Sequence, residues 1–380
     1  MIAVENYKSG YWEPAYQYKY FVPSYINDEW TWQTPAINQL LEKAAVKLGA
    51  LDAYSRLVPN TSLFIQLHVT KEAVLSSRIE GTQTRMDEAL FPIEEINPER
   101  RNDWQEVHNY INAMNEAIAE LKHLPLSSRL MKKTHYTLMQ SVRGEHKQPG
   151  EFRKSQNWIG GQSLSDAVFI PPAHPLIDDL MSDLEKFLHN DQLQIPALIR
   201  IAIAHYQFET IHPFLDGNGR IGRLLITLYL VSEGMLDQPL LYLSSFFEKN
   251  KGLYYDNLTH VRTRNDMLQW IKYFLVGVAQ TATQAVATLN RVLSLKSALE
   301  EKINRTFGRR SHSAQALLKH LFHTPVTTID AASKLCGLSF KSTGDLIFKM
   351  QEEGILKEVT GQQRNRLFVF EPYINAFEHE

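Results

Sequence analysis

The sequence predicts a mainly α-helical bundle that carries one β-hairpin and is followed by a small α+β domain. Apolar residues recur at spacings of three and four between residues 35 and 308, which is the period of a helix packed on one face. Two short β-prone runs surround a polar turn within residues 155–171. At 380 residues the chain exceeds the usual size of one domain, so two or three are expected.

Composition narrows the class of protein. A hydrophobic fraction of 44% with 22% charged residues is typical of a globular chain able to bury a core. The formal charge of −2 gives no general attraction to nucleic acid or to an anionic membrane. The single cysteine, Cys336, cannot form an intramolecular disulfide, which fits the cytoplasm. We find neither an apolar run of the ~18 to 20 residues that span a bilayer nor a signal peptide, and we expect a cytoplasmic protein without a membrane partner.

The first third of the chain is expected to be an arm followed by two helices. Residues 1–34 are rich in Tyr, Trp and Pro with little periodicity, which favours an arm or coil packed over the main body. Helical spacing begins at Pro35. The sequence Pro59-Asn60-Thr61 breaks it, and a second helical run follows from about Ser62 to Arg78.

The middle of the chain continues as helices. Residues 103–123 and 127–143 are expected to be scaffold, with Tyr136 among the apolar positions of the second. A helix that begins at Pro196 is apolar nearly all round, which predicts a central position and makes His205 a core histidine with satisfied hydrogen bonds. A further helix is expected from about Asn218 to Glu233, closed by a glycine.

Residues 212–223 carry the most chemical information. They read His-Pro-Phe-Leu-Asp-Gly-Asn-Gly-Arg-Ile-Gly-Arg and precede an apolar run. Two glycines around Asn218 predict a turn whose backbone N–H groups open into a helix N-terminus, which is an anion cradle. Arg220 and Arg223 lie three apart on the first turn of that helix and could bind successive phosphates.

The same motif holds a metal ligand and a base. Asp216 supplies a hard oxygen, and Mg²⁺ prefers one or two carboxylates together with substrate phosphates. His212 is the one side chain of the motif that titrates near neutrality, so it is the natural general base. His205 and His212 lack a third ligand at metal spacing, so zinc is not predicted. The motif therefore contains the elements of nucleotidyl transfer, apart from the hydroxyl nucleophile.

The motif resembles that of the Fic family in every defining position. The resemblance implies a Fic-type helical bundle and transfer of AMP from ATP to a Ser, Thr or Tyr hydroxyl of a protein. The Doc-like phosphotransfer branch usually carries Ala and Lys where this chain has Gly217 and Gly219, so the chain is similar to the AMP-transferring branch. The implied nucleotide-binding residues of the motif are Pro213, Phe214, Leu215, Gly217, Asn218, Gly219, Arg220 and Arg223, with Mg²⁺ on Asp216 and catalysis by His212.

A second stretch resembles the inhibitory helix of Fic proteins, written [S/T]xxxE[G/N]. Ser76 and Glu80 are four residues apart and share a helical face, and Gly81 is a residue type that commonly ends a helix. A Glu80 carboxylate paired with Arg223 would occupy the cation that should hold the ATP γ-phosphate. We therefore expect a restrained enzyme, slow until this contact is broken.

The resemblance also implies where the substrates bind. A flap at 155–171 would hold a protein target by strand addition. Beyond the motif, the residues implied to line the nucleotide pocket are Gln207, Tyr242, Tyr254 and Asn257. Without the resemblance, a Tyr-rich helix is usually core, and this alternative stays open. Self-modification and a homodimer also stay open.

The C-terminal region resembles a winged helix. Three helical runs are followed by paired strands at 357–359 and 367–370. Residues 311–380 hold seven Lys or Arg against eight Asp or Glu, a net charge of −1, whereas DNA readers usually show a basic stripe. We favour a protein-contacting or vestigial module over a DNA-binding one. The expected division is 1–100 for the arm and inhibitory helix, 101–283 for the Fic core, 284–310 for a connecting helix and 311–380 for the winged-helix domain.

Two other functions fit the same residues. Glu80 could orient a water that removes AMP from a modified protein. The chain could also be a DNA-binding regulator that only senses nucleotide. Such a sensor needs the phosphate cradle but not the base, so a change of His212 distinguishes a sensor from an enzyme.

Overall fold

The structure is a computed structural model that describes residues 1–57, 62–140 and 146–378. The break expected at 59–61 and the last three residues of the helix expected at 127–143 lie outside these ranges. The prediction of a mainly α-helical chain is confirmed. The helices of the main body are α1 (Pro35–Leu57), α2 (Ser62–Ile79), α3 (Arg101–Glu120), α4 (Ser128–Leu138), α5 (Ile177–His189), α6 (Ala197–Ile211), α7 (Asn218–Ser232), α8 (Ser244–Lys249), α9 (Lys251–Arg264) and α10 (Met267–Thr306).

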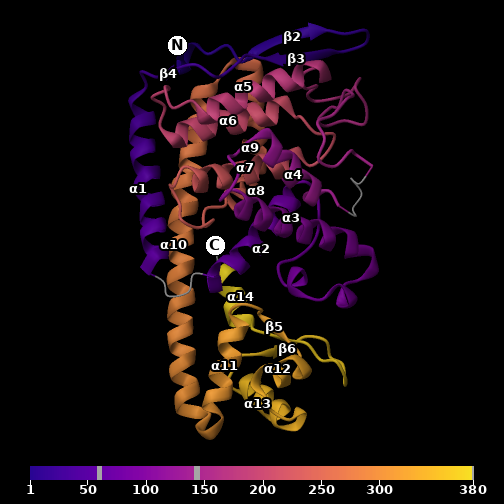
Figure 1. Cartoon of the computed structure of the whole chain (residues 1–380), viewed down its shortest axis with the longest axis vertical. Helices are drawn as coiled ribbons and strands as arrows, with labels where there is room; N and C mark the ends of the chain where they lie inside the picture. Colours follow the sequence, from indigo (N-terminus) through magenta and orange to yellow (C-terminus); the bar gives the residue numbers. More distant parts are fainter. Residues whose placement is uncertain (58–61, 141–145, 379–380) are drawn as a thin grey trace.

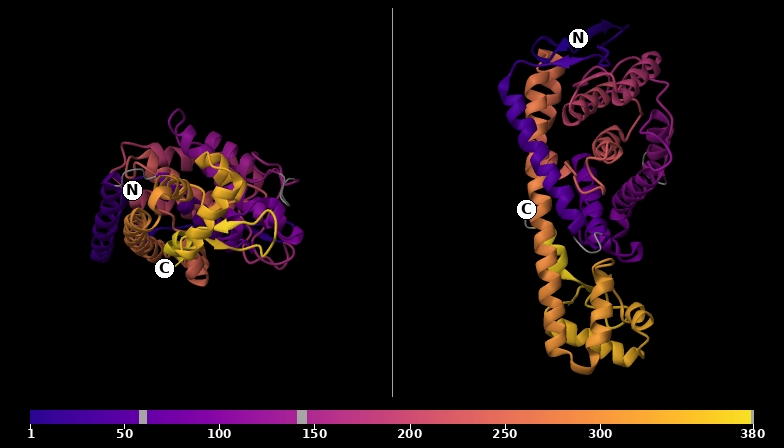
Figure 2. Two further views of the ribbon diagram at one scale, coloured as in Figure 1. Left: turned by 90° about the horizontal axis from the view of Figure 1, so that it is seen from below. Right: turned by 60° about the vertical axis from the view of Figure 1, so that its left-hand side comes forward.

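Helix α10 connects the two parts of the molecule. It runs for 40 residues, with α1 packed beside its first half and the C-terminal region at its far end (Figures 1 and 2). The sequence predicts a boundary near residue 283, but the helix continues through it. Ala282, Ala285 and Leu289 are all buried, so one apolar face crosses the expected boundary and no glycine or proline interrupts it there. The main body and the C-terminal region therefore share one helix.

The N-terminal arm is more ordered than its sequence suggests. Strands β2 (Gly10–Pro14) and β3 (Lys19–Pro23) form an antiparallel hairpin, and β1 (Ile2–Ala3) pairs in parallel with β4 (Trp30–Thr31). The expectation of a coil was wrong because aromatic residues occupy both faces of the hairpin and hide the alternation of a strand.

The segment predicted as a flap is less regular than expected. Instead of two strands it contains a single bridge between Ile159 and Phe169, closed by a turn at Gly160 and Gly161. The N-terminal hairpin packs against it, since the backbone N–H of Phe21 donates to the carbonyl of Ile170 at 2.9 Å. The flap is thus supported by a part of the chain that lies about 150 residues away in sequence.

The C-terminal region contains α11 (Ser311–Leu321), α12 (Ile329–Cys336) and α13 (Phe340–Glu352), followed by α14 (Glu371–Glu378). Its antiparallel sheet has the order β5 (Val326–Thr327), β7 (Phe368–Val369), β6 (Lys357–Glu358). The three helices and the later strand pair match the prediction, while β5 and α14 were not predicted. Helix α14 returns to the main body, where the ring of Phe377 lies 5.2 Å from that of Phe64 in α2.

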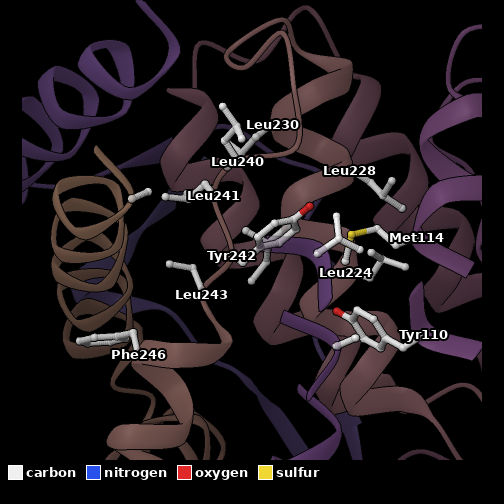
Figure 3. Close-up of a cluster of buried hydrophobic side chains, with 14 of the residues drawn as sticks. Tyr110, Met114, Leu224, Leu228, Leu230, Leu240, Leu241, Tyr242, Leu243 and Phe246 are labelled. Atoms are coloured by element: carbon white, nitrogen blue, oxygen red, sulfur yellow. The ribbon is translucent and has the colours of Figure 1, made fainter. Parts of the chain in front are cut away.

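The buried hydrophobic core extends from the N-terminal arm to the C-terminal region, and one part of it lies between α3, α7 and the segment that leads into α8. Figure 3 shows leucines of α7 and of this segment packed around Tyr242, with Tyr110 and Met114 of α3 on one side. Across the described ranges, none of the helices combines the length and the apolarity that a bilayer span requires.

Candidate functional site

The loop between α6 and α7 is held in one conformation by its own residues. His212, the C-cap of α6, has a left-handed backbone (φ 50°), and so does Gly217, the N-cap of α7 (φ 76°). The Asn218 side chain bonds Phe214 twice: its Oδ1 accepts from the backbone N–H and its Nδ2 donates to the carbonyl, both at 2.8 Å. The sequence analysis assigned Asn218 to the phosphates, which stays a prediction; its Oδ1 and one hydrogen of its Nδ2 are used within the loop.

Gly217 and Gly219 keep the start of α7 open. A methyl group at Gly217 would approach Met139 Sδ to 2.9 Å, and one at Gly219 would collide with the Glu80 carboxylate. The first N–H groups of a helix have no intrahelical acceptor. The Gly217 N–H is taken by Asp216 Oδ1 at 2.6 Å, which leaves the N–H groups of the first turn of α7 to form the cradle.

His212 is neutral and has a free ring nitrogen. Its Nδ1 lies 3.4 Å from the carbonyl of Glu209, and its Nε2 has no hydrogen-bond partner among residues 1–57, 62–140 and 146–378. Burial, with the nearby cations Arg262 and Arg153, lowers the pKa of His212 to about 3. At neutral pH the ring can therefore donate from Nδ1 and accept a proton at Nε2.

His135 of α4 supports the loop, although the sequence singled out its neighbour Tyr136. Its ring stacks on Phe214 at 3.8 Å, its Nδ1 accepts from the N–H of Gly150 at 2.9 Å, and its Nε2 lies 3.0 Å from the carbonyl of Asp216. Burial lowers the pKa of His135 to about 4, so the neutral ring donates from Nε2. Tyr136, expected on the packed face, is 54% exposed.

Arg153 and Asn157 tie the base of the flap to the catalytic loop. Arg153 is buried, with its Nε 3.0 Å from the His212 carbonyl, and its two terminal nitrogens donate to the carbonyls of Ser155, Pro172 and Ile211. Asn157 Nδ2 donates to the carbonyls of His212 and Phe214. The sequence gave no signal for either residue, because contacts to carbonyls require no matching side chain.

We expect Arg153→Ala to destabilise the protein by about 3 kcal/mol or more, because it leaves buried carbonyls without donors. Thermal or urea unfolding of the purified variant measures this. The neighbouring Lys154 is exposed, so Lys154→Ala is the matched control and should change stability by less than about 0.5 kcal/mol. Equal stability of the two variants would contradict this role of Arg153.

Arg220 is buried and paired within the protein. Its Nη1 lies 3.3 Å from Glu106 Oε2, and its Nη2 lies 3.7 Å from Asp216 Oδ1. The carboxylates fix the guanidinium beside the cradle, where it contributes positive charge near the first turn of α7. The sequence analysis predicts that Arg220 orients phosphates directly, which stays a prediction.

Arg223 is joined to the end of α2 as the sequence analysis expected. Its Nε donates to Ser76 Oγ at 2.9 Å and its Nη2 to the Ser76 carbonyl at 2.8 Å. The same Nη2 donates to Glu80 Oε1 at 2.6 Å. Gly81 follows with φ 108° and allows the chain to turn away. The predicted contact between Glu80 and Arg223 is therefore present, and it lies over Gly219 at the mouth of the cradle.

Electrostatics strengthens this pair. Partial burial opposes ionisation of Glu80, but the Arg223 guanidinium outweighs it and lowers the pKa of this carboxyl. Burial likewise opposes the charge on Arg223, while Glu80 raises the pKa of the guanidinium above its usual value. A carboxyl with a lowered pKa keeps its ion pair at neutral pH and loses it only as the pH falls through that lowered value.

Two further carboxyls lie deep beside Arg223. Burial raises the pKa of Glu72 in α2 to about 7 and that of Glu209 in α6 to about 7, against the attraction of Arg223. Glu72 Oε1 accepts from Ser244 Oγ at 2.5 Å and from Tyr110 Oη at 3.1 Å.

We expect Glu72→Gln to remove a pH dependence of stability. A raised folded-state pKa stabilises the fold fully at acid pH, and this stability is lost as the pH rises through about 7. Between pH 5 and pH 8 the variant should gain about 2 to 3 kcal/mol relative to the parent in urea unfolding. Glu42→Gln, at an exposed position of α1, is the control. Identical pH dependence in the parent and in Glu72→Gln would refute the shift.

Two of the residues implied to bind the nucleotide outside the motif, Gln207 and Tyr242, make their contacts with other parts of the protein. Gln207 is fully buried and its Nε2 donates to the carbonyl of Ser24 in the arm, at 2.9 Å. Tyr242 is buried among leucines, with its ring 4.9 Å from that of His68 (Figure 3). The contacts of Gln207 and Tyr242 therefore join them to other elements and not to the cradle.

Helix α9 carries two neighbouring tyrosines, Tyr254 and Tyr255, that both interact electrostatically with Glu80 and Arg223. Tyr254 is buried and its hydroxyl bonds His205 Nε2 at 2.9 Å, while His205 Nδ1 bonds the Gly222 carbonyl. The prediction that His205 is a satisfied core residue is confirmed. Tyr255, which the sequence analysis passed over, is 39% exposed, and Glu80 contributes to raising its pKa after burial itself. Asn257 keeps a buried Oδ1 without a partner in the described ranges, which suits a hydrogen-bond donor of a ligand.

Asp216 fits a magnesium site completed by substrate. Its side chain is half exposed, and one carboxylate oxygen is used by the Gly217 N–H. The described residues contain no cluster of three or more His, Cys, Asp or Glu that could hold a metal ion without substrate. A single carboxylate beside an anion cradle is the donor set that Mg²⁺ accepts when phosphates supply further oxygens.

Comparisons with known proteins relate two parts of the chain to one family. Residues 38–119 match the family model "Fic/DOC family N-terminal" and residues 125–230 match "Fic/DOC family". The chain is 30% identical over 167 residues to the protein adenylyltransferase Fic of Culex quinquefasciatus, covering 43% of this chain and 30% of that protein. It is 27% identical over 240 residues to a probable protein adenylyltransferase of Aquifex aeolicus (strain VF5), covering 61% and 64%.

The chain therefore spans between about a third and two thirds of these relatives. Among solved structures, it is similar to a Fic family protein from Desulfovibrio desulfuricans G20. That similarity has a TM-score of 0.56 and 20% identity, and covers 89% of this chain and 96% of the other. At this identity the likeness shows a shared fold.

Proposed function

Because this chain belongs to the Fic/DOC family, we propose that it transfers AMP from ATP to a hydroxyl group of a protein. The observation that carries the proposal is the geometry of one loop: a neutral His212 with a free Nε2 directly follows α6, and the N-terminus of α7 begins at Asn218, six residues later. A base and an anion cradle at this spacing suit attack by a hydroxyl on a bound phosphate.

The reaction follows from these positions. The N–H groups at the start of α7 bind the phosphates of ATP, with the charges of Arg220 and Arg223 close by. The target hydroxyl attacks the α-phosphorus, and the bond from that phosphorus to the departing diphosphate breaks. His212 accepts the hydroxyl proton at Nε2. Asp216 would hold Mg²⁺, which would neutralise charge on the phosphates.

Restraint by Glu80 is part of the proposal. The Arg223 guanidinium is 2% exposed and already has three hydrogen bonds, two to Ser76 of α2 and one to Glu80 directly after this helix. An incoming γ-phosphate would compete with a carboxylate for the same nitrogen. The enzyme should therefore be slow while α2 and Glu80 keep these positions.

A protein target would dock on the flap. Residues 155–171 have one bridge, between Ile159 and Phe169, and exposed side chains such as Val168 at 74%. An extended target segment added beside the flap would need only main-chain groups, which places little demand on its sequence. The same site would accept a hydroxyl of another copy of the chain, so self-modification is included in the proposal.

The test uses ATP labelled at either end. The Glu80→Gly form is incubated with Mg²⁺ and with α-labelled or γ-labelled ATP, with and without a cell lysate, and label on protein is measured by intact mass and autoradiography. AMP transfer predicts incorporation of the α label alone. Incorporation of the γ label would instead establish phosphotransfer.

AMP removal is the second candidate, because the Glu80 carboxylate is 35% exposed and acts electrostatically on His212. A water bound between Glu80 and a modified target could be the nucleophile. Loss of AMP from a pre-modified protein, faster with the parent chain than with Glu80→Gly, would favour removal over transfer.

We also propose that the C-terminal region binds protein and not DNA. Leu335 of α12 and Phe340 and Phe348 of α13 are 43%, 64% and 56% exposed, which is an apolar surface without a basic stripe. Salt-dependent binding of duplex DNA by the full chain, weakened by Lys341→Glu, would overturn this assignment.

A further inference from the structure

A pocket of about 680 Å³ lies on the outer face of α2. Lys71, Val74, Leu75 and Arg78 line it at spacings of three and four, so they share one face of the helix. Ser76 and Glu80, which hold Arg223, fall on the opposite face. The pocket and the catalytic arginine therefore touch the same helix from its two sides.

The other walls come from three further elements. Phe246 belongs to α8, Gln280 and Gln284 to α10, and Phe377 to α14. Figure 1 shows the end of the C-terminal region returning to α2 at this place, and the carbonyl of Phe377 accepts from Lys71 Nζ at 2.7 Å. A molecule in the pocket would thus contact the inhibitory helix and the end of the C-terminal region together.

The lining is apolar inside and cationic at its edge. Its apolar part is made by Val74, Leu75, Met86, Phe246 and Phe377. Its charged residues are Lys71, Arg78, Arg85 and Lys249 against the single acid Glu248, which gives four positive charges, one negative and a net charge of +3.

The cations of the pocket differ in whether they already form ion pairs within the protein. Arg78 is 3.9 Å from Glu248, and Arg85 is paired with Asp87 at 2.8 Å. Lys249 is exposed and forms no ion pair with any of the described residues. Lys249 and Arg78 are therefore the residues best able to accept an added anion.

The inner end of the pocket continues into a cavity with room for about one water. Glu72, Tyr242 and Thr281 line it, and each is at most 4% exposed. Glu72 Oε2, Tyr242 Oη and Thr281 Oγ1 have no hydrogen-bond partner within the described ranges. Buried polar atoms are nearly always satisfied, so this end is built for a water or for a polar group of a ligand.

We propose that this pocket binds an amphipathic anion, with a phosphate or carboxylate group at the Arg78 and Lys249 edge and an apolar body inside. Its volume lies in the range of small-molecule sites. The pocket is formed by α2 in the position that holds Arg223, so occupancy favours that position and strengthens the restraint. This second part rests on the proposed function, whereas the binding does not.

Binding is tested by calorimetry on the full chain with four probes below their micellar concentrations. Octyl phosphate and octanoate carry both features and distinguish the two head groups. Octyl glucoside carries only the apolar body and inorganic phosphate only the charge. Binding of at least one amphipathic anion, with neither control binding comparably, is expected; equal binding of octyl glucoside or of phosphate would overturn the proposal.

Two variants of the pocket residues test whether the anion binds there. The double change Arg78→Glu/Lys249→Glu should weaken binding of the anion about tenfold or more, because it replaces attraction by repulsion at the edge. Ser245→Trp, which fills the pocket from α8, should abolish it. Lys341→Glu, an exposed charge reversal in α13, is the matched control. Unchanged binding in both pocket variants, with unfolding midpoints like the parent, would refute the site.

Coupling to α2 is measured without ATP. Hydrogen exchange of the α2 amides should slow when the anion binds, and in separate assays AMP labelling should fall in the parent but not in Glu80→Gly. Binding without slower exchange would overturn the coupling. Because binding and exchange involve no transfer, they would stand even if the chain failed to transfer AMP.

Discussion

Replacing His212 with alanine in the Glu80→Gly background should lower the rate of AMP transfer by at least about 10²-fold. The side chain contributes little to holding the loop, since its ring has one weak contact of 3.4 Å through Nδ1. The loop is fixed instead by the Asn218 amide and by Arg153, which bonds the backbone carbonyl of residue 212. The loss should therefore appear in the chemical step, measured as initial rate at saturating ATP.

Two controls separate chemistry from folding. Calorimetry should show ATP affinity within about threefold of the parent, because the cradle consists of backbone groups of α7 and not of the imidazole. His212→Asn keeps a polar side chain at a position with φ 50°, where Asn is well tolerated, and it should be as inactive as the alanine form. Rates within about threefold of the parent in both variants would favour a nucleotide sensor.

The sequence predicted the catalytic loop because its chemistry is contiguous. His212, Asp216 and the glycines lie within twelve residues, so the chain itself brings them together, and the structure adds only the exact turn. Glu80 and Arg223 are 143 residues apart, and their contact was expected from a family resemblance, not from spacing. Arg153 was missed for a physical reason: its partners are carbonyls, which every residue carries.

An error of helical face explains one other miss. Neighbouring positions on a helix differ by about 100°, so a one-residue error exchanges a buried side chain for an exposed one. Tyr136 was chosen where its neighbour His135 is packed against Phe214. The sequence of a Tyr-Tyr pair carries no information about which ring points inward; the hydrogen bond from Tyr254 to His205 decides it.

The change Glu80→Gly should raise the rate of AMP transfer by roughly 10-fold to 100-fold. The expected factor corresponds to one hydrogen bond between charged groups, about 1.5 to 3 kcal/mol, that no longer competes with the γ-phosphate. Residue 80 lies just beyond the last residue of α2, so glycine there costs little helix stability. The measurement is the initial rate of α-label incorporation by the parent and the variant at equal ATP.

Arg223 should remain in place in this variant, which makes the effect specific. Its bonds to Ser76, from Nε to the hydroxyl and from Nη2 to the carbonyl, do not involve Glu80. The guanidinium would thus stay beside the cradle while one terminal nitrogen becomes free for a phosphate oxygen. Glu80→Gln retains an acceptor but loses the charge, so its rate of AMP transfer should lie between that of the parent and that of Glu80→Gly. If α2 blocked nucleotide by its bulk, Glu80→Gly and Glu80→Gln would both match the parent, and only displacement of the helix would activate the enzyme.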